Sequence, residues 1–137
     1  MQQTSTPVKW TTQLQTGVIW QDMQHIELLD KLCALHYAIS EGREISEVED
    51  TFSFLDHYTK SHFAIEESYM AQYQYADYQL HKQQHGKFIS DLNTLKKDFS
   101  VRNKLTSFAL CFDLNTWFVD HINVADKKLG TFLKNKA

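Results

Sequence analysis

This 137-residue chain has little of the chemistry that makes tight turns, with one proline and four glycines. Proline and glycine punctuate hairpins and loops, so their scarcity argues against a sheet protein and favours long helices throughout. The chain also lacks any apolar run near the roughly 18 residues that a membrane span requires. Residues 1–15 contain no apolar stretch of signal-peptide length. We therefore expect a cytoplasmic, all-α protein with no membrane partner.

Cysteine and excess charge are scarce as well. Cys33 and Cys111 stand alone, without a C-x-x-C pair, which predicts reduced thiols in a core and neither a disulfide nor a catalytic thiol. The formal net charge is −3, and the basic residues are dispersed except near the C-terminus. Nucleic-acid-binding domains concentrate basic residues on one face, so we expect no nucleic acid partner.

Hydrophobic periodicity predicts four helices. Their expected ranges are residues 22–41, 46–72, 77–99 and 103–133. Asp22 and Asp77 are expected to cap the first and third helices, and Ser46 and Glu49 to form a capping box at the second. The positions expected to be apolar and core-facing include Ile26, Leu29, Cys33, Tyr37, Phe52, Leu55, Phe63, Tyr69, Leu80, Phe88, Leu92 and Leu95.

Helices of this length with short connections pack as antiparallel neighbours. The chain is therefore predicted to be one domain over residues 1–137. It comprises an N-terminal arm at residues 1–21 and an up-down-up-down four-helix bundle at residues 22–133.

Five of the seven histidines recur with two acids in a pattern typical of a metal site. They are His25, His62, His81, His85 and His121, with Glu66 and Asp126. His62 with Glu66, and His81 with His85, are four residues apart, which places each pair on one helix face. Counting from the shared turns puts most of the set at one level of the bundle, with a mismatch of about one helical turn for His121. Imidazole nitrogen and carboxylate oxygen suit zinc or iron, and a cluster large enough for two ions suggests iron or manganese.

His121 and Asp126 are the weak part of this pattern, because five residues correspond to about 140° around an ideal α-helix. Spacing alone does not nominate Asp126. The candidacy of this residue rests on a resemblance between the whole chain and a known family.

The chain from Gly17 to Gly130 resembles the hemerythrin family, and especially its single-domain bacterial members. The matching motifs are Asp22-x-Gln24-His25, His62-Phe63-x-x-Glu66-Glu67, His81-x-x-x-His85 and Trp117-x-x-x-His121-Ile122-x-x-x-Asp126. The resemblance implies a non-haem di-iron centre that binds dioxygen reversibly, for storage, transport or delivery. It also implies one iron held by His81, His85 and His121, a second held by His25 and His62, and bridges from Glu66, Asp126 and a solvent-derived oxygen.

This arrangement implies a closed first iron and a second iron with an open position for dioxygen. The expected walls of the oxygen pocket are Phe63, Trp117, Phe118 and Ile122. Phe118 occupies a position where we expect leucine, and its larger ring is expected to narrow access or alter autoxidation. Glu67 is expected to point into solvent, with a hydrogen bond to a ligand imidazole as the alternative. The two remaining histidines, His36 and His57, are expected to be structural.

The chain contains no E-x-x-H motif, which the oxidase-type di-iron bundles use. We therefore expect an oxygen-binding protein that is not an enzyme, and a monomer. Three alternatives remain open: an oxygen or redox sensor, a di-iron oxidoreductase acting on peroxide or nitric oxide, and a bundle that buffers iron or needs metal only to fold.

Overall fold

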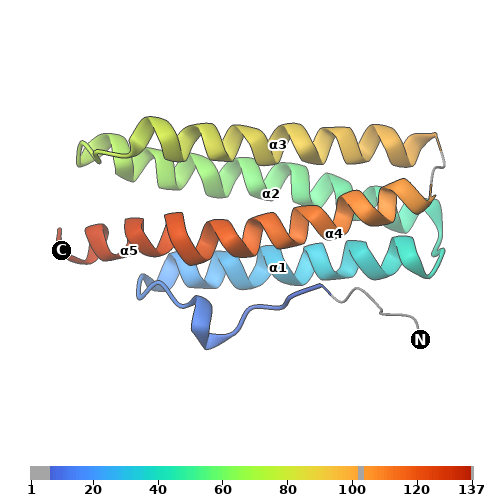
Figure 1. The fold of residues 1–137 in the computed structure, drawn as a ribbon, viewed down its shortest axis with the longest axis horizontal. Helices are drawn as coiled ribbons and strands as arrows, with labels where there is room; N and C mark the ends of the chain where they lie inside the picture. Colours follow the sequence, from blue (N-terminus) through green and yellow to red (C-terminus); the bar gives the residue numbers. More distant parts are fainter. Residues whose placement is uncertain (1–6, 102–103, 137) are drawn as a thin grey trace.

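Four long helices lie side by side in this computed structural model, which describes residues 7–101 and 104–136 (Figure 1). The helical elements are α1 (Ile19–Ser40), α2 (Ile45–Gln72), α3 (Tyr78–Ser100), α4 (Lys104–His121), a π-helical turn (Ile122–Asp126) and α5 (Lys127–Lys134), after a short 3₁₀ turn (Thr12–Leu14). The described ranges contain no strand. Helix α1 contacts α2 and α4, and α3 contacts the same two helices. The predicted all-α, antiparallel bundle is confirmed.

The start of α1 differs from its prediction. The helix begins at Ile19, with Val18 in the capping position, so the arm ends three residues earlier than expected. Asp22 is not the N-cap, because it lies inside the first turn of the helix. Its carboxylate accepts hydrogen bonds from the backbone N–H (2.8 Å) and the hydroxyl (2.9 Å) of Thr16. The side chain therefore ties the arm to the first turn of the helix.

The other predicted caps are also wrong in detail. Helix α2 begins at Ile45 after Glu44, and no side chain caps it. Asp77 occupies the N-cap of α3 but makes no cap hydrogen bond, because its carboxylate forms an ion pair with Lys128 of α5. The predicted start of the fourth helix, at residue 103, lies outside the described residues.

The core consists mainly of leucine and phenylalanine from all four helices. Its fully buried side chains include Leu28, Leu29, Leu32, Leu35, Leu55, Phe63, Phe88, Leu92, Leu95, Phe118 and Ile122. Burying one such side chain contributes roughly 1.5–3 kcal/mol. Cys33 and Cys111 are buried free thiols, as predicted.

Three predicted core positions face solvent. Leu80 is 56% exposed, Ile26 37% and Tyr37 36%. At each place a histidine takes the inward position: His81 on α3, and His25 and His36 on α1, are buried. An apolar residue next to an inward histidine is rotated about 100° out of the core. Apolar periodicity alone therefore misplaced the inward face.

The N-terminal arm runs along the outside of α1 (Figure 1). Asn115 of α4 is buried and binds Val8 twice, accepting from its N–H at 2.7 Å and donating to its carbonyl at 3.1 Å. Trp10 is partly buried and packs against the core. Trp20 belongs to α1 and stacks on Tyr69 of α2 at 5.2 Å. The arm and the beginning of α1 are thus held by specific contacts.

Helix α5 contacts the arm at Gly130. A Cβ atom at this position would lie 2.9 Å from the Thr16 Cβ and 3.0 Å from its carbonyl oxygen. We therefore expect Gly130→Ala to destabilise the protein by about 1–3 kcal/mol, because the clash outweighs the better helix propensity of alanine. Urea unfolding measures the change.

Gly86 of α3 provides the matched control, since a Cβ atom there meets nothing within 4 Å. Gly86→Ala is expected to stabilise the protein by about 0.5–1 kcal/mol through helix propensity alone. Equal effects of the two substitutions would contradict a close approach of α5 and the arm.

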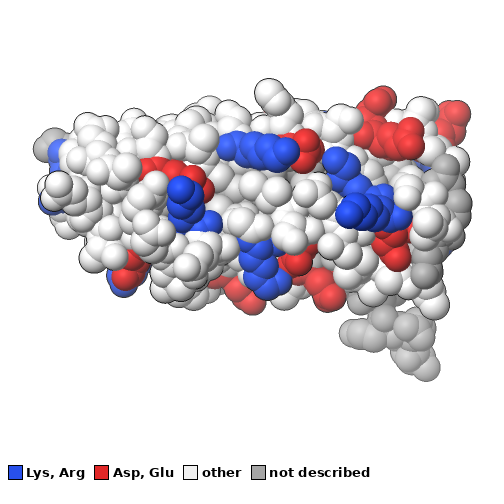
Figure 2. Space-filling view, turned by 90° about the horizontal axis from the view of Figure 1, so that it is seen from above, with Lys and Arg blue, Asp and Glu red and all other residues white. Residues whose placement is uncertain are grey.

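The surface mixes charges of both signs. On the face shown in Figure 2, lysine and arginine side chains lie among aspartates and glutamates. Exposed i,i+4 pairs such as Lys87 with Asp91 contribute little to stability. None of the helices in the described ranges is both long enough and apolar enough to cross a membrane.

Candidate metal centre

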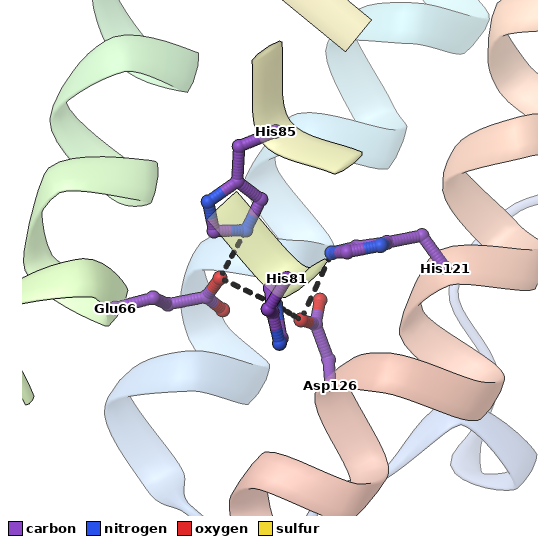
Figure 3. A group of neighbouring side chains, drawn as sticks. All are labelled: Glu66, His81, His85, His121 and Asp126. Carbon is purple, nitrogen blue, oxygen red and sulfur yellow. Dashed lines mark hydrogen bonds and ion pairs between the residues drawn. The ribbon is translucent and has the colours of Figure 1, made fainter. Parts of the chain in front are cut away.

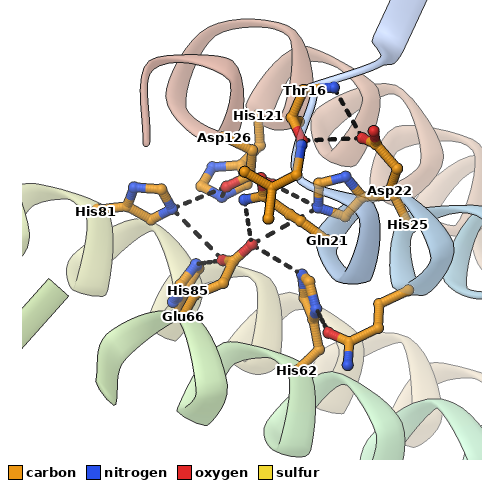
Figure 4. A network of polar contacts seen from close by, with 12 residues as sticks. Thr16, Gln21, Asp22, His25, His62, Glu66, His81, His85, His121 and Asp126 are labelled. Atoms are coloured by element: carbon orange, nitrogen blue, oxygen red, sulfur yellow. Dashed lines mark hydrogen bonds and ion pairs between the residues drawn. The ribbon is translucent and has the colours of Figure 1, made fainter. Parts of the chain in front are cut away.

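The seven candidate ligands converge at the end of the bundle where α1 begins and α2 ends (Figures 3 and 4). They come from every long helix: His25 from α1, His62 and Glu66 from α2, His81 and His85 from α3, His121 from the end of α4 and Asp126 from the end of the π-helical turn. All seven are buried. Residues as far apart in the sequence as His25 and Asp126 therefore share one interior site.

Two groups of ligands can be distinguished, and they share both carboxylates. The three-histidine group comprises His81, His85 and His121 with Glu66 and Asp126. The two-histidine group comprises His25 and His62 with the same two acids. In each group one ligand atom from every residue lies within 4.8 Å of all the others. The structure thus presents two adjacent positions where a cation fits.

Glu66 presents one oxygen to each group. Its Oε1 lies 3.0 Å from Nε2 of His85 in the three-histidine group. Its Oε2 lies 3.1 Å from Nε2 of His62 in the two-histidine group. The carboxylate is therefore oriented as a bridge.

The two carboxylate oxygens of Asp126 likewise face different ligand groups. Its Oδ1 lies 2.9 Å from Nε2 of His81 and 3.1 Å from Nε2 of His121. Its Oδ2 lies 2.9 Å from Nε2 of His25. Both acids thus face both groups, and each histidine presents Nε2 to the centre of the site.

The π-helical turn explains how His121 and Asp126 meet. An α-helix would separate these residues by about 140°, whereas the i→i+5 hydrogen bonds of a π-helix bring residues five apart onto one face. The turn covers Ile122–Asp126, immediately after His121. The sequence pattern missed this turn, because nothing in the spacing of apolar residues marks one extra residue in a long helix.

The donor atoms fit a bound cation better than they fit a simple polar core. The Nε2 atoms of His25, His62, His85 and His121, with Glu66 Oε1 and Asp126 Oδ2, are buried and make no hydrogen bond. Leaving such an atom unsatisfied costs about 1–3 kcal/mol. Imidazole nitrogens and carboxylate oxygens aimed at common points are the ligands that iron, zinc and manganese use.

Polar side chains behind the ligands orient three of the imidazoles. Nδ1 of His121 lies 2.8 Å from Gln84 Oε1, and Nδ1 of His62 contacts Gln24 Oε1. Nδ1 of His85 lies 2.9 Å from Glu67 Oε2. An oxygen acceptor at Nδ1 keeps the proton there and leaves Nε2 free to bind a metal.

Glu67 is thus not directed into solvent, and its predicted orientation is wrong. Its side chain is 23% exposed and reaches from α2 across to His85 of α3. The sequence pattern predicts no role for the two glutamines that contact ligand histidines. Each directly precedes a candidate ligand, Gln24 before His25 and Gln84 before His85, yet each binds a histidine of a neighbouring helix.

Gln84→Leu is expected to weaken cation binding by about tenfold or more, the lower end of the 10–100-fold effect typical of such outer partners. The substitution removes the acceptor that holds His121. Gln83 is exposed on the same helix, so Gln83→Leu is the control and should leave affinity unchanged. Calorimetric titration with Zn²⁺ measures both, and equal affinities would exclude an orienting role for Gln84.

The carboxylates are ionised in this environment. Burial alone would raise the pKa of Glu66 and Asp126, but the surrounding imidazoles hold the pKa of both acids well below the usual range. Burial alone would lower the pKa of His25 and His81, but the close carboxylates of Asp126 and Glu66 raise the pKa of each to about 9. A cation entering the site therefore competes with protons on these two histidines.

Aromatic rings enclose the ligands. Phe63 stacks on His85 with ring centres 3.9 Å apart, and Trp117 stacks on His121 at 4.9 Å. Phe118 is fully buried and presents its edge to His25 at 5.8 Å. A surface hollow of about 250 Å³ reaches His121 beside Trp117. Ile122, the fourth predicted wall residue, is also fully buried.

The two other histidines lie outside both ligand groups. His36 is buried between aromatic rings, with its ring centre 4.6 Å from that of Phe108. His57 is exposed on α2.

Comparisons with known proteins agree with this geometry. The family model described as the hemerythrin HHE cation binding domain matches residues 16–133. The chain is 30% identical over 125 residues to a bacteriohemerythrin of Methylococcus capsulatus, covering 90% of this chain and 95% of that protein. It is 30% identical over 117 residues to a bacteriohemerythrin of Pseudomonas paraeruginosa, covering 85% and 75%. A bacteriohemerythrin of Ralstonia nicotianae is 22% identical over 129 residues, covering 94% and 90%. The motifs, the four-helix bundle and these matches together place the chain in the hemerythrin family, as a cation-binding domain.

Proposed function

We propose that this protein binds dioxygen reversibly at a pair of iron ions, for oxygen storage, transport or delivery. The observation that carries the proposal is the asymmetry of the site. Two carboxylates are shared between three histidines on one side and two on the other. Because the two-histidine group offers one protein ligand fewer, a metal held there would have room for an external ligand.

Each group of ligands would hold one ion. The three-histidine group would hold one ion, the two-histidine group the other, and Glu66 and Asp126 would lie between them. A pair of iron ions held here would supply the two electrons that reversible binding of dioxygen requires. Five imidazoles with only two carboxylates keep the negative charge of the ligands low, which disfavours the higher oxidation states that carboxylate-rich sites support.

The walls of the site keep water out. Phe63, Trp117 and Phe118 pack directly on ligand rings, so these imidazoles contact apolar carbon where solvent would otherwise stand. An apolar shell limits solvent access and displacement of a bound ligand. Phe118 lies against His25, on the side of the two-histidine group. We expect its ring to narrow the space open to an external ligand there.

The test is reconstitution with Fe²⁺ without air, followed by cycles of adding and removing oxygen. We expect about two iron ions per chain and a charge-transfer absorption band that appears with oxygen and disappears without it. Protein loaded with Zn²⁺ is the control and should show no band. Irreversible oxidation within one cycle would contradict the carrier function.

We expect the protein to bind dioxygen without turnover and so not to act as an enzyme. Steady-state assays with hydrogen peroxide and with nitric oxide should show no more turnover than free iron at the same concentration. Sustained turnover would identify a di-iron oxidoreductase instead.

A sensor function is the second candidate, favoured by the contact between the arm and the site. The backbone and hydroxyl of Thr16 bind Asp22, three residues before His25 in the same helix. A change at His25 can therefore reach the arm. Hydrogen exchange in residues 7–18 should differ between the oxygenated and reduced forms of a sensor, and identical exchange would exclude it.

A further inference from the structure

A buried glutamine touches the metal site from a direction that the sequence pattern did not reveal. Gln21 lies in the first turn of α1, four residues before His25, and is fully buried. Glutamine is mostly exposed in proteins. Figure 4 shows its amide pointing to the carboxylate of Glu66.

Gln21 forms a hydrogen bond with only one of the two oxygens of that carboxylate. Gln21 Nε2 donates a hydrogen bond to Glu66 Oε2 at 2.9 Å. An ionised carboxylate only accepts, so the amino side of the amide faces it. Oε2 is the oxygen that faces His62 in the two-histidine group, whereas Oε1 faces His85 in the other.

The surroundings hold the glutamine in place. A Cβ atom on Gly130 would lie 3.3 Å from Gln21 Oε1, so α5 passes close behind the amide. Gln21 Oε1 itself is buried and has no hydrogen-bond partner. Burying an amide with one atom unsatisfied is unfavourable compared with an apolar side chain of the same size. The hydrogen bond to Glu66 is the favourable interaction that this arrangement keeps.

We propose that Gln21 is a positioning residue, which holds Glu66 Oε2 toward the two-histidine group and thereby sets the cation affinity of that group alone. The inference rests on the proposed function in one respect, the presence of two cation positions. Without the amide, Oε2 loses the hydrogen bond that holds it before His62. Oε1 retains its own contact with His85, so the three-histidine group is affected much less.

The test is a stepwise titration of the protein with Co²⁺ under nitrogen, comparing wild type with Gln21→Met. Methionine has a similar volume and flexibility but no donor. We expect the two-histidine step to weaken about tenfold, as for other outer partners of metal ligands, and the three-histidine step to change less than twofold. A His62→Ala variant, in which the two-histidine step is removed, assigns the two steps.

Two further variants complete the design. Gln21→Asn keeps the amide but is one methylene shorter, so it should show the same selective loss if Gln21→Met does not fold. Gln83→Met, at an exposed position of α3, should leave both steps unchanged. A residue that merely fills space would weaken both steps equally or neither, and either result overturns the proposal. Co²⁺ binding does not depend on oxygen chemistry. The titration can therefore be interpreted even if the iron-loaded protein fails to bind oxygen reversibly.

Discussion

Replacing Glu66 with alanine is expected to abolish cation binding at both ligand groups. The side chain supplies one oxygen to each group, Oε1 beside His85 and Oε2 beside His62. Its loss removes a ligand from both positions and one of the two negative charges of the site. Outer partners of metal ligands typically contribute 10–100-fold in affinity, so loss of a shared direct ligand should cost at least about 100-fold. Metal content after dialysis and calorimetric titration measure the effect.

Glu67→Gln is the matched control, one position along the same helix. A glutamine there keeps an oxygen acceptor for Nδ1 of His85, so affinity should stay within about threefold, well short of the loss of an outer partner. Far-UV circular dichroism checks that both variants remain helical. If Glu66→Ala still held two cations with near wild-type affinity, the carboxylate would not bridge them.

Phe88→Ala should give the largest loss of stability, about 3–5 kcal/mol of the free energy of unfolding. Phe88 is fully buried on α3, and its ring centre lies 5.8 Å from that of Phe63, 5.6 Å from Trp117 and 5.5 Å from Phe118. Truncation would leave a cavity among the rings that pack on the ligand histidines. We therefore expect weaker cation binding together with the lower urea midpoint.

Leu105→Ala provides the comparison at the surface. Leu105 is 84% exposed on α4, so its truncation should change stability by less than about 0.5 kcal/mol. A loss below about 1 kcal/mol for Phe88→Ala would mean that the cavity collapses, and that the aromatic cluster is not the rigid support of the site.

The sequence predicted the site best where two ligands lie one helical turn apart in the same helix. His62 with Glu66 and His81 with His85 are one helical turn apart, and the structure brings them together as that spacing predicts. The fold class followed from the scarcity of turn residues and from apolar periodicity. Each of these signals arises within a single helix. It can therefore be interpreted without knowing how the helices pack against one another.

The contacts that cross between helices could not be read in the same way. Gln84 binds His121 across α3 and α4, and Glu67 reaches His85 across α2 and α3. Their partners depend on the rotation of each helix about its axis, which apolar periodicity fixes only loosely. Leu80 and Ile26 were misplaced for the same reason, since inward histidines occupy the positions beside them.

The π-helical turn at Ile122–Asp126 has a consequence for how this helix tolerates change in length. Relative to an α-helix, such a turn behaves as one inserted residue, and it offsets the two flanking stretches by about 100°. With this offset in place, His121 before the turn and Asp126 at its end lie on one face, and both are buried candidate ligands. Deleting a single residue between His121 and Asp126 would let the helix relax into a regular form without unfolding it, and the two residues, then four apart, would still share one face. Straightening the turn with all its residues kept would instead rotate Asp126 about 100° away from His121. The metal site should therefore tolerate a shorter helix at this place better than a regular helix of the same length.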